Sequence, residues 1–134
     1  TVRNSTGTPL HRRFQPLRAV MGMRPIPADA AASDDTAESL RLRTRDPGHA
    51  LAMLFGHGRH RIWLEGGPTL AAAFLRAGLV ARVVASLAPA LLGDGPAAVG
   101  DLGVTTVAAA VQFDLIDVAQ VGSDLRITAR SRKG

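Results

Sequence analysis

Short blocks of apolar residues alternate with polar and turn-forming segments along the chain, and the period of each block predicts a strand or a helix. Period-two alternation is clearest where Leu40 and Leu42 alternate with Arg41 and Arg43, which predicts a strand with one buried face. The four blocks that predict strands are residues 17–21, 39–44, 61–65 and 79–88. Residues 4–16 and 28–38 lack apolar periodicity, so we expect a loop and a surface segment there.

Two helices are predicted between these strands. Asp46 and Pro47 are typical of an N-cap and a first helical position, because proline has no N–H to leave unsatisfied there. We expect this helix to run to about Phe55 and to be closed by Gly56, and its apolar stripe consists of Leu51, Leu54 and Phe55. The second helix follows Pro68 and ends at Gly78, with a stripe of Leu70, Ala71, Phe74 and Leu75.

The order of these elements predicts an α/β fold. Strands that alternate with helices over short connections are typical of a parallel sheet with right-handed crossovers and helices on its faces. The tail differs, because residues 111–115 and 125–129 alternate apolar and polar positions around the turn-forming Gly122-Ser123-Asp124. We therefore predict a mostly parallel central sheet, flanked by helices and completed by a C-terminal antiparallel hairpin, within a single domain over residues 1–134.

Composition excludes several classes of protein. With 134 residues, 46% of them hydrophobic, the chain is long enough to bury one core. It has no cysteine, which excludes disulfides and thiolate metal sites, and its histidines lack carboxylates at ligand spacing, so we expect no metal. Apolar stretches are too short to cross a bilayer and no export signal is visible, so we expect a cytoplasmic protein without membrane association.

The basic excess indicates a phosphorylated small molecule as partner. Sixteen Lys and Arg against eleven Asp and Glu give a net charge of +5, and several arginines lie near the start of the chain. The cations do not line one helix face, aromatic residues make up only 4% of the chain, and no nucleic-acid motif occurs. Nucleic acid therefore ranks last among the partners considered.

Residues 62–70 carry the clearest chemistry. A predicted strand ends at Glu65, and the pair Gly66-Gly67 then opens a helix. Glycines let a ligand approach the backbone, and we expect the free N–H groups of Thr69 and Leu70 to point outward at the positive end of the helix dipole. This arrangement is typical of a phosphate-binding turn. The alternatives are that the glycines only connect a strand to a helix and that Glu65 stays solvated or stabilises the helix.

A series of motifs runs in order through most of the chain. The motifs are Thr1-Val2-Arg3, Gln15-Pro16-Leu17-Arg18, Leu64-Glu65-Gly66-Gly67-Pro68-Thr69-Leu70, Phe74-Leu75, Ala77-Gly78-Leu79-Val80, Ala88-Pro89-Ala90-Leu91-Leu92-Gly93 with Gly95, Asp101-Leu102-Gly103 and Gly122-Ser123-Asp124-Leu125. This series resembles the reductase domain of the bifunctional riboflavin-biosynthesis deaminase/reductase.

The resemblance implies a three-layer dihydrofolate-reductase-like fold and NADPH as hydride donor. It also implies reduction of 5-amino-6-(5-phosphoribosylamino)uracil, a phosphorylated pyrimidine, to the ribitylamino compound. By the same resemblance Arg3 and Glu65 would bind the substrate, and Arg3 would bind its phosphate. The implied cofactor contacts are Met23, Gly67, Pro68, Thr69, Leu70, Ala71, Ala72 and Ala73. Catalytic side chains stay unassigned, because hydride transfer needs positioning rather than a nucleophile.

The chain also departs from the family pattern. Ala81 stands where the family has an acidic residue, and no zinc deaminase domain fits a chain without cysteine. We expect the N-terminal part of the reductase domain to lie upstream of Thr1, with further substrate and cofactor contacts. A homodimer is expected from the family fold. Two alternatives stay open, a related reductase acting on another substrate such as a folate, and a truncated piece without activity of its own.

Overall fold

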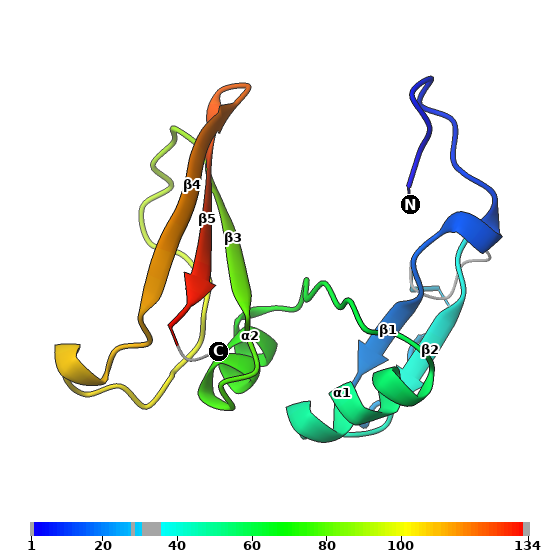
Figure 1. The fold of residues 1–134 in the computed structure, drawn as a ribbon, viewed down its shortest axis with the longest axis horizontal. Helices are drawn as coiled ribbons and strands as arrows, with labels where there is room; N and C mark the ends of the chain where they lie inside the picture. Colours follow the sequence, from blue (N-terminus) through cyan, green and yellow to red (C-terminus); the bar gives the residue numbers. More distant parts are fainter. Residues whose placement is uncertain (1, 28, 31–35, 133–134) are drawn as a thin grey trace. The chain divides into compact units, whose positions relative to one another are not determined.

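Two compact units, Thr1–His60 and Arg61–Gly134, make up the structure, a computed structural model that describes residues 2–27, 29–30 and 36–132. Each unit contains a helix and a sheet, so the predicted α/β class is confirmed (Figure 1). That the two units form one domain stays a prediction. Within the described ranges, no helix has the length and apolar character needed to cross a bilayer.

The N-terminal unit is built around a short parallel sheet. Its strands β1 (Arg18–Met21) and β2 (Ser39–Leu42) pair in parallel with Arg18 opposite Ser39, so both predicted strands are confirmed. A 3-10 turn, η1 (Arg12–Phe14), interrupts the predicted loop before β1. The core consists of Leu42, Ala50 and Leu54, against which Leu17, Met21, Leu40 and Met53 pack. The acidic pair Asp34-Asp35 of the predicted surface segment lies outside the described residues.

Residues close in sequence determine where helix α1 (Pro47–Gly56) begins and ends. The Asp46 side chain accepts a hydrogen bond from the His49 N–H, which confirms the predicted N-cap. The helix ends one residue later than predicted, because Gly58 rather than Gly56 adopts the left-handed backbone, with φ +71°. The Arg59 N–H then donates to the Leu54 carbonyl at 2.9 Å, as in a Schellman motif.

The predicted strand at residues 61–65 does not form, and this expectation was wrong. The backbone of residues 61–66 makes no hydrogen bond to any described residue. The apolar side chains are exposed, with Trp63 at 70% of its full accessible surface. A buried strand is stabilised by backbone hydrogen bonds to neighbouring strands. No strand of the described ranges pairs with this segment. The apolar run therefore stays extended but unpaired.

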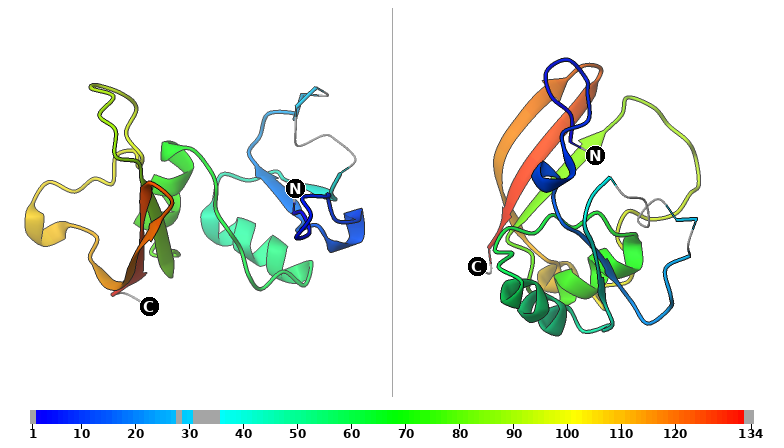
Figure 2. Two further views of the ribbon diagram at one scale, coloured as in Figure 1. Left: turned by 90° about the horizontal axis from the view of Figure 1, so that it is seen from above. Right: turned by 90° about the vertical axis from the view of Figure 1, so that its right-hand side faces the viewer.

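The C-terminal unit contains helix α2 (Pro68–Arg76) and a three-stranded sheet of β3 (Arg82–Leu87), β4 (Phe113–Val121) and β5 (Asp124–Ser131). The strand order is β3-β5-β4 and both pairings are antiparallel. The predicted hairpin is confirmed, with its turn at Gly122 and Ser123, and Figure 2 shows it as a long twisted arm. Helix α2 ends as predicted, because Gly78 is left-handed with φ +67°.

The prediction of a mostly parallel sheet is corrected by these pairings. The strand predicted at residues 79–88 forms as β3 but pairs antiparallel with β5, and the described strands contain one parallel pair, β1 with β2. A right-handed crossover into a parallel β3 requires a strand at residues 61–65 in the same sheet. Without that strand, β3 takes the long β5 as its partner through six opposed residue pairs from Arg82–Arg130 to Leu87–Leu125.

Candidate functional site

The start of α2 is the predicted phosphate-binding turn. Gly67 is the N-cap residue and has no side chain to satisfy the first N–H groups of the helix. Its carbonyl accepts hydrogen bonds from Leu70 and Ala71, both at 3.1 Å. The expectation that the Leu70 N–H points free was therefore wrong, because the first turn is tight enough to bond it internally. Among the described residues, the N–H groups of Gly67 and Thr69 have no acceptor.

The two glycines before α2 have different surroundings. A Cβ atom added at Gly66 would lie 2.9 Å from Cβ and 3.0 Å from Cγ of Leu70, so the side chain of Leu70 requires a glycine there. A Cβ added at Gly67 would meet no atom within 4 Å. Neither glycine has a positive φ. Gly66 is thus needed for packing, whereas the surface over Gly67 is open to a ligand.

A loop of the same unit, at Gly100, packs against the first turn of α2. The Gly100 N–H donates to the Pro68 carbonyl at 3.0 Å. A Cβ atom at Gly100 would lie 3.6 Å from the Cβ of Ala72, and Ala72 itself is buried, with 2% of its surface exposed. At the other end of the helix, the Arg76 guanidinium donates to the Asp101 carbonyl at 3.2 Å. Sequence reasoning missed this support, although Asp101-Leu102-Gly103 was among the motifs it used.

The remaining cofactor candidates on α2 divide into two faces. Pro68 and Thr69 are exposed beside Gly67, whereas Leu70, Ala71 and Ala73 are half-buried. Ala72 faces the Gly100 loop and is not accessible to a ligand on the open side. The surface available at this turn is therefore that of residues 67–69, bordered by the half-buried side chains.

Glu65 directly precedes this turn. Its side chain is exposed and forms no hydrogen bond or ion pair with any described residue. A carboxylate without an internal partner is free to accept hydrogen bonds from hydroxyl groups of a ligand. Glu65 is two residues before Gly67, so both lie in the same segment of the C-terminal unit.

Arg3 and Met23, the other two candidates, belong to the N-terminal unit. The Arg3 guanidinium donates one hydrogen bond, at 2.7 Å, to the Gly7 carbonyl of its own loop. The backbone of Arg3 forms an isolated antiparallel β-bridge with Pro9. Its other guanidinium N–H groups have no acceptor among the described residues, so they can bind an anion. Met23 follows β1 with an exposed side chain, and its carbonyl accepts a hydrogen bond from Arg41 at 2.7 Å.

The loop that carries Arg3 is held by two amide side chains. The Asn4 carboxamide oxygen accepts hydrogen bonds from the backbone N–H groups of Thr6 and Thr8, at 3.1 and 2.9 Å. The Gln15 side chain bonds both the N–H and the carbonyl of Val2, at 2.6 and 2.9 Å. The sequence predicted only a loop here, because neither contact leaves a periodic pattern.

Comparison with known proteins gives a consistent result. The family model described as the RibD C-terminal domain matches residues 1–127. The riboflavin biosynthesis protein RibD of Mycobacterium tuberculosis (strain ATCC 25618 / H37Rv) is 43% identical over 118 residues, which cover 88% of this chain and 34% of that protein. The same protein of Escherichia coli (strain K12) is 43% identical over 65 residues, or 48% of this chain and 18% of its own length.

A solved structure shows the same fold. Form 2 of Acinetobacter baumannii RibD aligns with a TM-score of 0.77 at 24% identity, over 88% of this chain and 38% of that chain. This likeness concerns the fold, in keeping with the α/β class seen here. The chain spans 34% of the length of the Mycobacterium tuberculosis relative that it matches.

Proposed function

Because this chain belongs to the RibD C-terminal domain family, we propose that it carries the reductase activity of riboflavin biosynthesis. The reaction is the NADPH-dependent reduction of 5-amino-6-(5-phosphoribosylamino)uracil to its ribitylamino product. The observation that carries the proposal is the match of the family model to residues 1–127, which include every candidate site residue. Within the chain, the best support is the open surface at the start of α2.

The start of α2 fits the diphosphate of a dinucleotide. The N–H groups of Gly67 and Thr69 lack acceptors, the helix dipole favours an anion at this end, and no atom occupies the space over Gly67. The exposed Thr69 hydroxyl adds a further donor. We assign the cofactor to the open surface of residues 67–69, bordered by the half-buried Leu70, Ala71 and Ala73. Met23 stays a contact that the family resemblance implies. When bound, the reduced nicotinamide supplies the hydride that the sugar receives.

The substrate contacts in this proposal are Glu65 and Arg3. Glu65 has an exposed, unpaired carboxylate and accepts hydrogen bonds from the hydroxyl groups of the ring-opened sugar. Arg3 keeps free guanidinium N–H groups and binds the phosphate. Both roles are positioning roles, which is what hydride transfer requires of the protein.

Two substitutions at Gly67 separate an effect on anion binding from an effect on the stability of α2. Asp and Asn are both good N-caps, so Gly67→Asp and Gly67→Asn should each preserve or raise the stability of α2. Only the aspartate places a negative charge beside the bound diphosphate. We expect Gly67→Asp to weaken NADPH binding at least about tenfold relative to Gly67→Asn, which corresponds to about 1.4 kcal/mol. Equal NADPH affinity in the two variants, measured by titration, would contradict the assignment of the cofactor to this turn.

The competing hypotheses differ in turnover. A reductase for another substrate would turn over dihydrofolate and NADPH faster than the aminopyrimidine phosphate. An inactive piece would show no turnover, but activity would appear once upstream sequence is added. The unpaired segment at residues 61–66 favours this second alternative over the folate reductase, because a segment without backbone partners can accept a further strand.

A homodimer is part of the proposal, and its support lies in the sheet of the C-terminal unit. Four large apolar side chains on one face of this sheet are about half exposed. The register of the strands places them together, and they are Leu87, Leu115, Val118 and Leu125. A second copy that covers this face would bury them. We expect Val118→Lys to shift the protein toward the monomer in light scattering, whereas Val107→Lys, on the exposed turn η3 (Val107–Ala109), should not. The expected location is the cytoplasm.

A further inference from the structure

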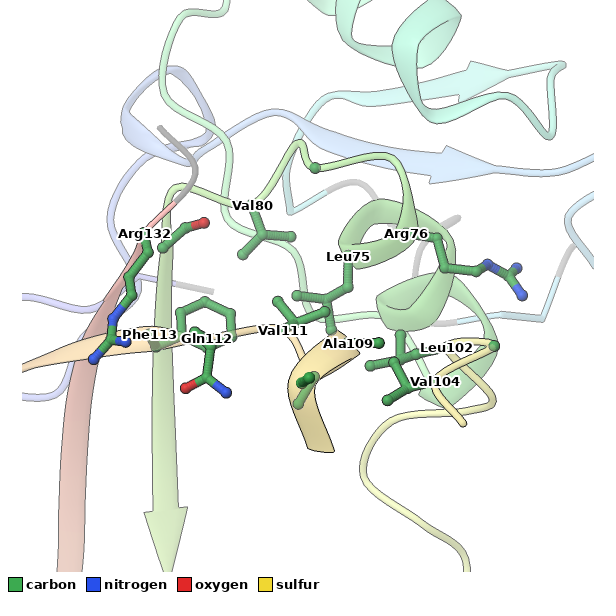
Figure 3. Close-up of a pocket in the computed structure, with 15 residues that line it drawn as sticks. Leu75, Arg76, Val80, Leu102, Val104, Ala109, Val111, Gln112, Phe113 and Arg132 are labelled. Carbon is green, nitrogen blue, oxygen red and sulfur yellow. The ribbon is translucent and has the colours of Figure 1, made fainter. Parts of the chain in front are cut away.

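A cavity of about 530 Å³ lies within the C-terminal unit beside the last turn of α2. Figure 3 shows Leu75, Val80 and Val111 pointing toward one another from three different segments, so they form an apolar wall. None of residues 65–73 lines this cavity. It is therefore separate from the proposed cofactor surface at the start of the same helix.

The polar groups of the cavity are cationic or neutral. Arg132 lies beside Phe113 at the edge of the cavity (Figure 3). Its Nε donates to the Asp114 carboxylate at 2.7 Å, and its two terminal nitrogens have no acceptor among the described residues. The side-chain amide of Gln112 likewise has none. No carboxylate occurs among the described residues that line the cavity.

The cavity has the size of a small-molecule site. Sites of this kind measure about 300 to 1,000 Å³, with mostly apolar walls and a few polar groups that fix the ligand. The ring of Phe113 next to Arg132 provides an aromatic surface beside a cation, which favours a ring system that carries its anionic group at one end. A single ring would leave most of this volume empty.

We propose that this cavity binds an aromatic acid of two or three rings. The rings lie against Leu75, Val80 and Val111, and the carboxylate or sulfonate accepts hydrogen bonds from the terminal nitrogens of Arg132. Arg132 supplies the donors for the anion, because its terminal nitrogens have no acceptor among the described residues and no described carboxylate lines the cavity. This site is independent of the proposed reductase activity.

The test uses 8-anilinonaphthalene-1-sulfonate, a fluorescent aromatic sulfonate, on the full chain. We expect saturable binding at one site per chain and displacement by 2-naphthoate. The neutral 2-naphthamide and the aliphatic octanoate should each require concentrations at least about tenfold higher, since they lack the charge or the rings. Equal potency of the amide or of octanoate would overturn the proposal.

Matched variants connect the binding to the cavity. Val111→Asp places a carboxylate in the apolar wall and should abolish probe binding, whereas Leu91→Asp, at a fully exposed position outside the cavity, should not. Arg132→Gln should remove the preference for naphthoate over naphthamide, and Asp114→Asn should keep it. If circular dichroism shows that Val111→Asp perturbs the fold, the relative affinity of Arg132→Gln for naphthoate and naphthamide still tests the proposal. An unchanged preference in Arg132→Gln, or equal loss in Leu91→Asp and Val111→Asp, contradicts the inference.

Discussion

Gly100 donates its backbone N–H to the carbonyl oxygen of Pro68 at 3.0 Å, and a Cβ atom at Gly100 would approach that oxygen to 3.2 Å. The contact joins the loop before Asp101 to the first turn of α2, where the proposed diphosphate site lies. Because the neighbouring atom belongs to the backbone, it cannot rotate away as a side chain would. The position of this turn therefore depends on the absence of a side chain at Gly100.

Gly100→Ala should lower the stability of the protein and weaken NADPH binding. The added methyl group must displace the loop or the first turn, and overpacking of this kind destabilises proteins by about 1 to 3 kcal/mol. The measurement is the free energy of unfolding in urea together with an NADPH titration. Gly95→Ala is the matched control, since a Cβ there meets no atom within 4 Å. Equal unfolding energies for the two variants would show that the loop does not press on α2.

Gly66→Ala and Gly67→Ala should affect the protein differently, although the two glycines are neighbours. At Gly66 the new methyl group would lie 2.9 Å from Cβ of Leu70, so we expect a loss of about 1 to 3 kcal/mol of unfolding free energy. At Gly67 no clash arises, and the expected loss is that of a poorer N-cap, about 1 kcal/mol or less. Leu70→Ala removes Cγ, which would lie 3.0 Å from the new methyl group, but keeps Cβ, so it should rescue only part of the Gly66→Ala defect in a double-mutant cycle. A cycle without coupling would contradict this contact.

The parts of the fold that the sequence predicted well are those that depend on neighbouring residues. Asp46 as N-cap, Gly78 at the end of α2 and Gly122 in the hairpin turn are each determined by local backbone geometry. The strand at residues 61–65 failed because pairing is a long-range property. An apolar run shows that a segment could be buried, but it does not show which strand would lie beside it.

In the candidate site too, the sequence predicted local features but not those that depend on residues distant in sequence. The open backbone at Gly67 could be inferred from the glycine pair and the helix that follows. The internal hydrogen bond of Leu70 and the support from Gly100 could not, because the first depends on the tightness of a turn and the second on a loop distant in sequence. The cavity near Val111 gave no signal either, because its lining comes from the end of α2, the residues before β4 and the end of β5, which meet only in the folded chain.

Asp46→Ala should destabilise α1 by about 1 kcal/mol, because the His49 N–H would lose its acceptor at the start of the helix. Asp46→Asn keeps an acceptor oxygen in the same place and should stay close to the parent chain. Urea unfolding followed by circular dichroism measures both. If the asparagine variant loses as much as the alanine variant, the charge of Asp46 rather than its capping bond is what matters.

Trp63 is the one tryptophan of the chain, and it reports directly on the unpaired segment. Its side chain is 70% exposed, and the backbone on either side makes no hydrogen bond with the described residues. We therefore expect long-wavelength fluorescence of an indole in water, strong quenching by acrylamide, and fast hydrogen exchange of the amides at residues 62–66. Addition of upstream sequence, if it supplies a partner strand for this segment, should shift the emission to shorter wavelength and protect these amides. Phe74→Trp in a Trp63→Phe background gives the matched buried reference, because Phe74 is only 6% exposed. Emission from Trp63 that resembles this reference in the chain alone would mean that residues 61–65 are buried after all, as their apolar pattern first indicated.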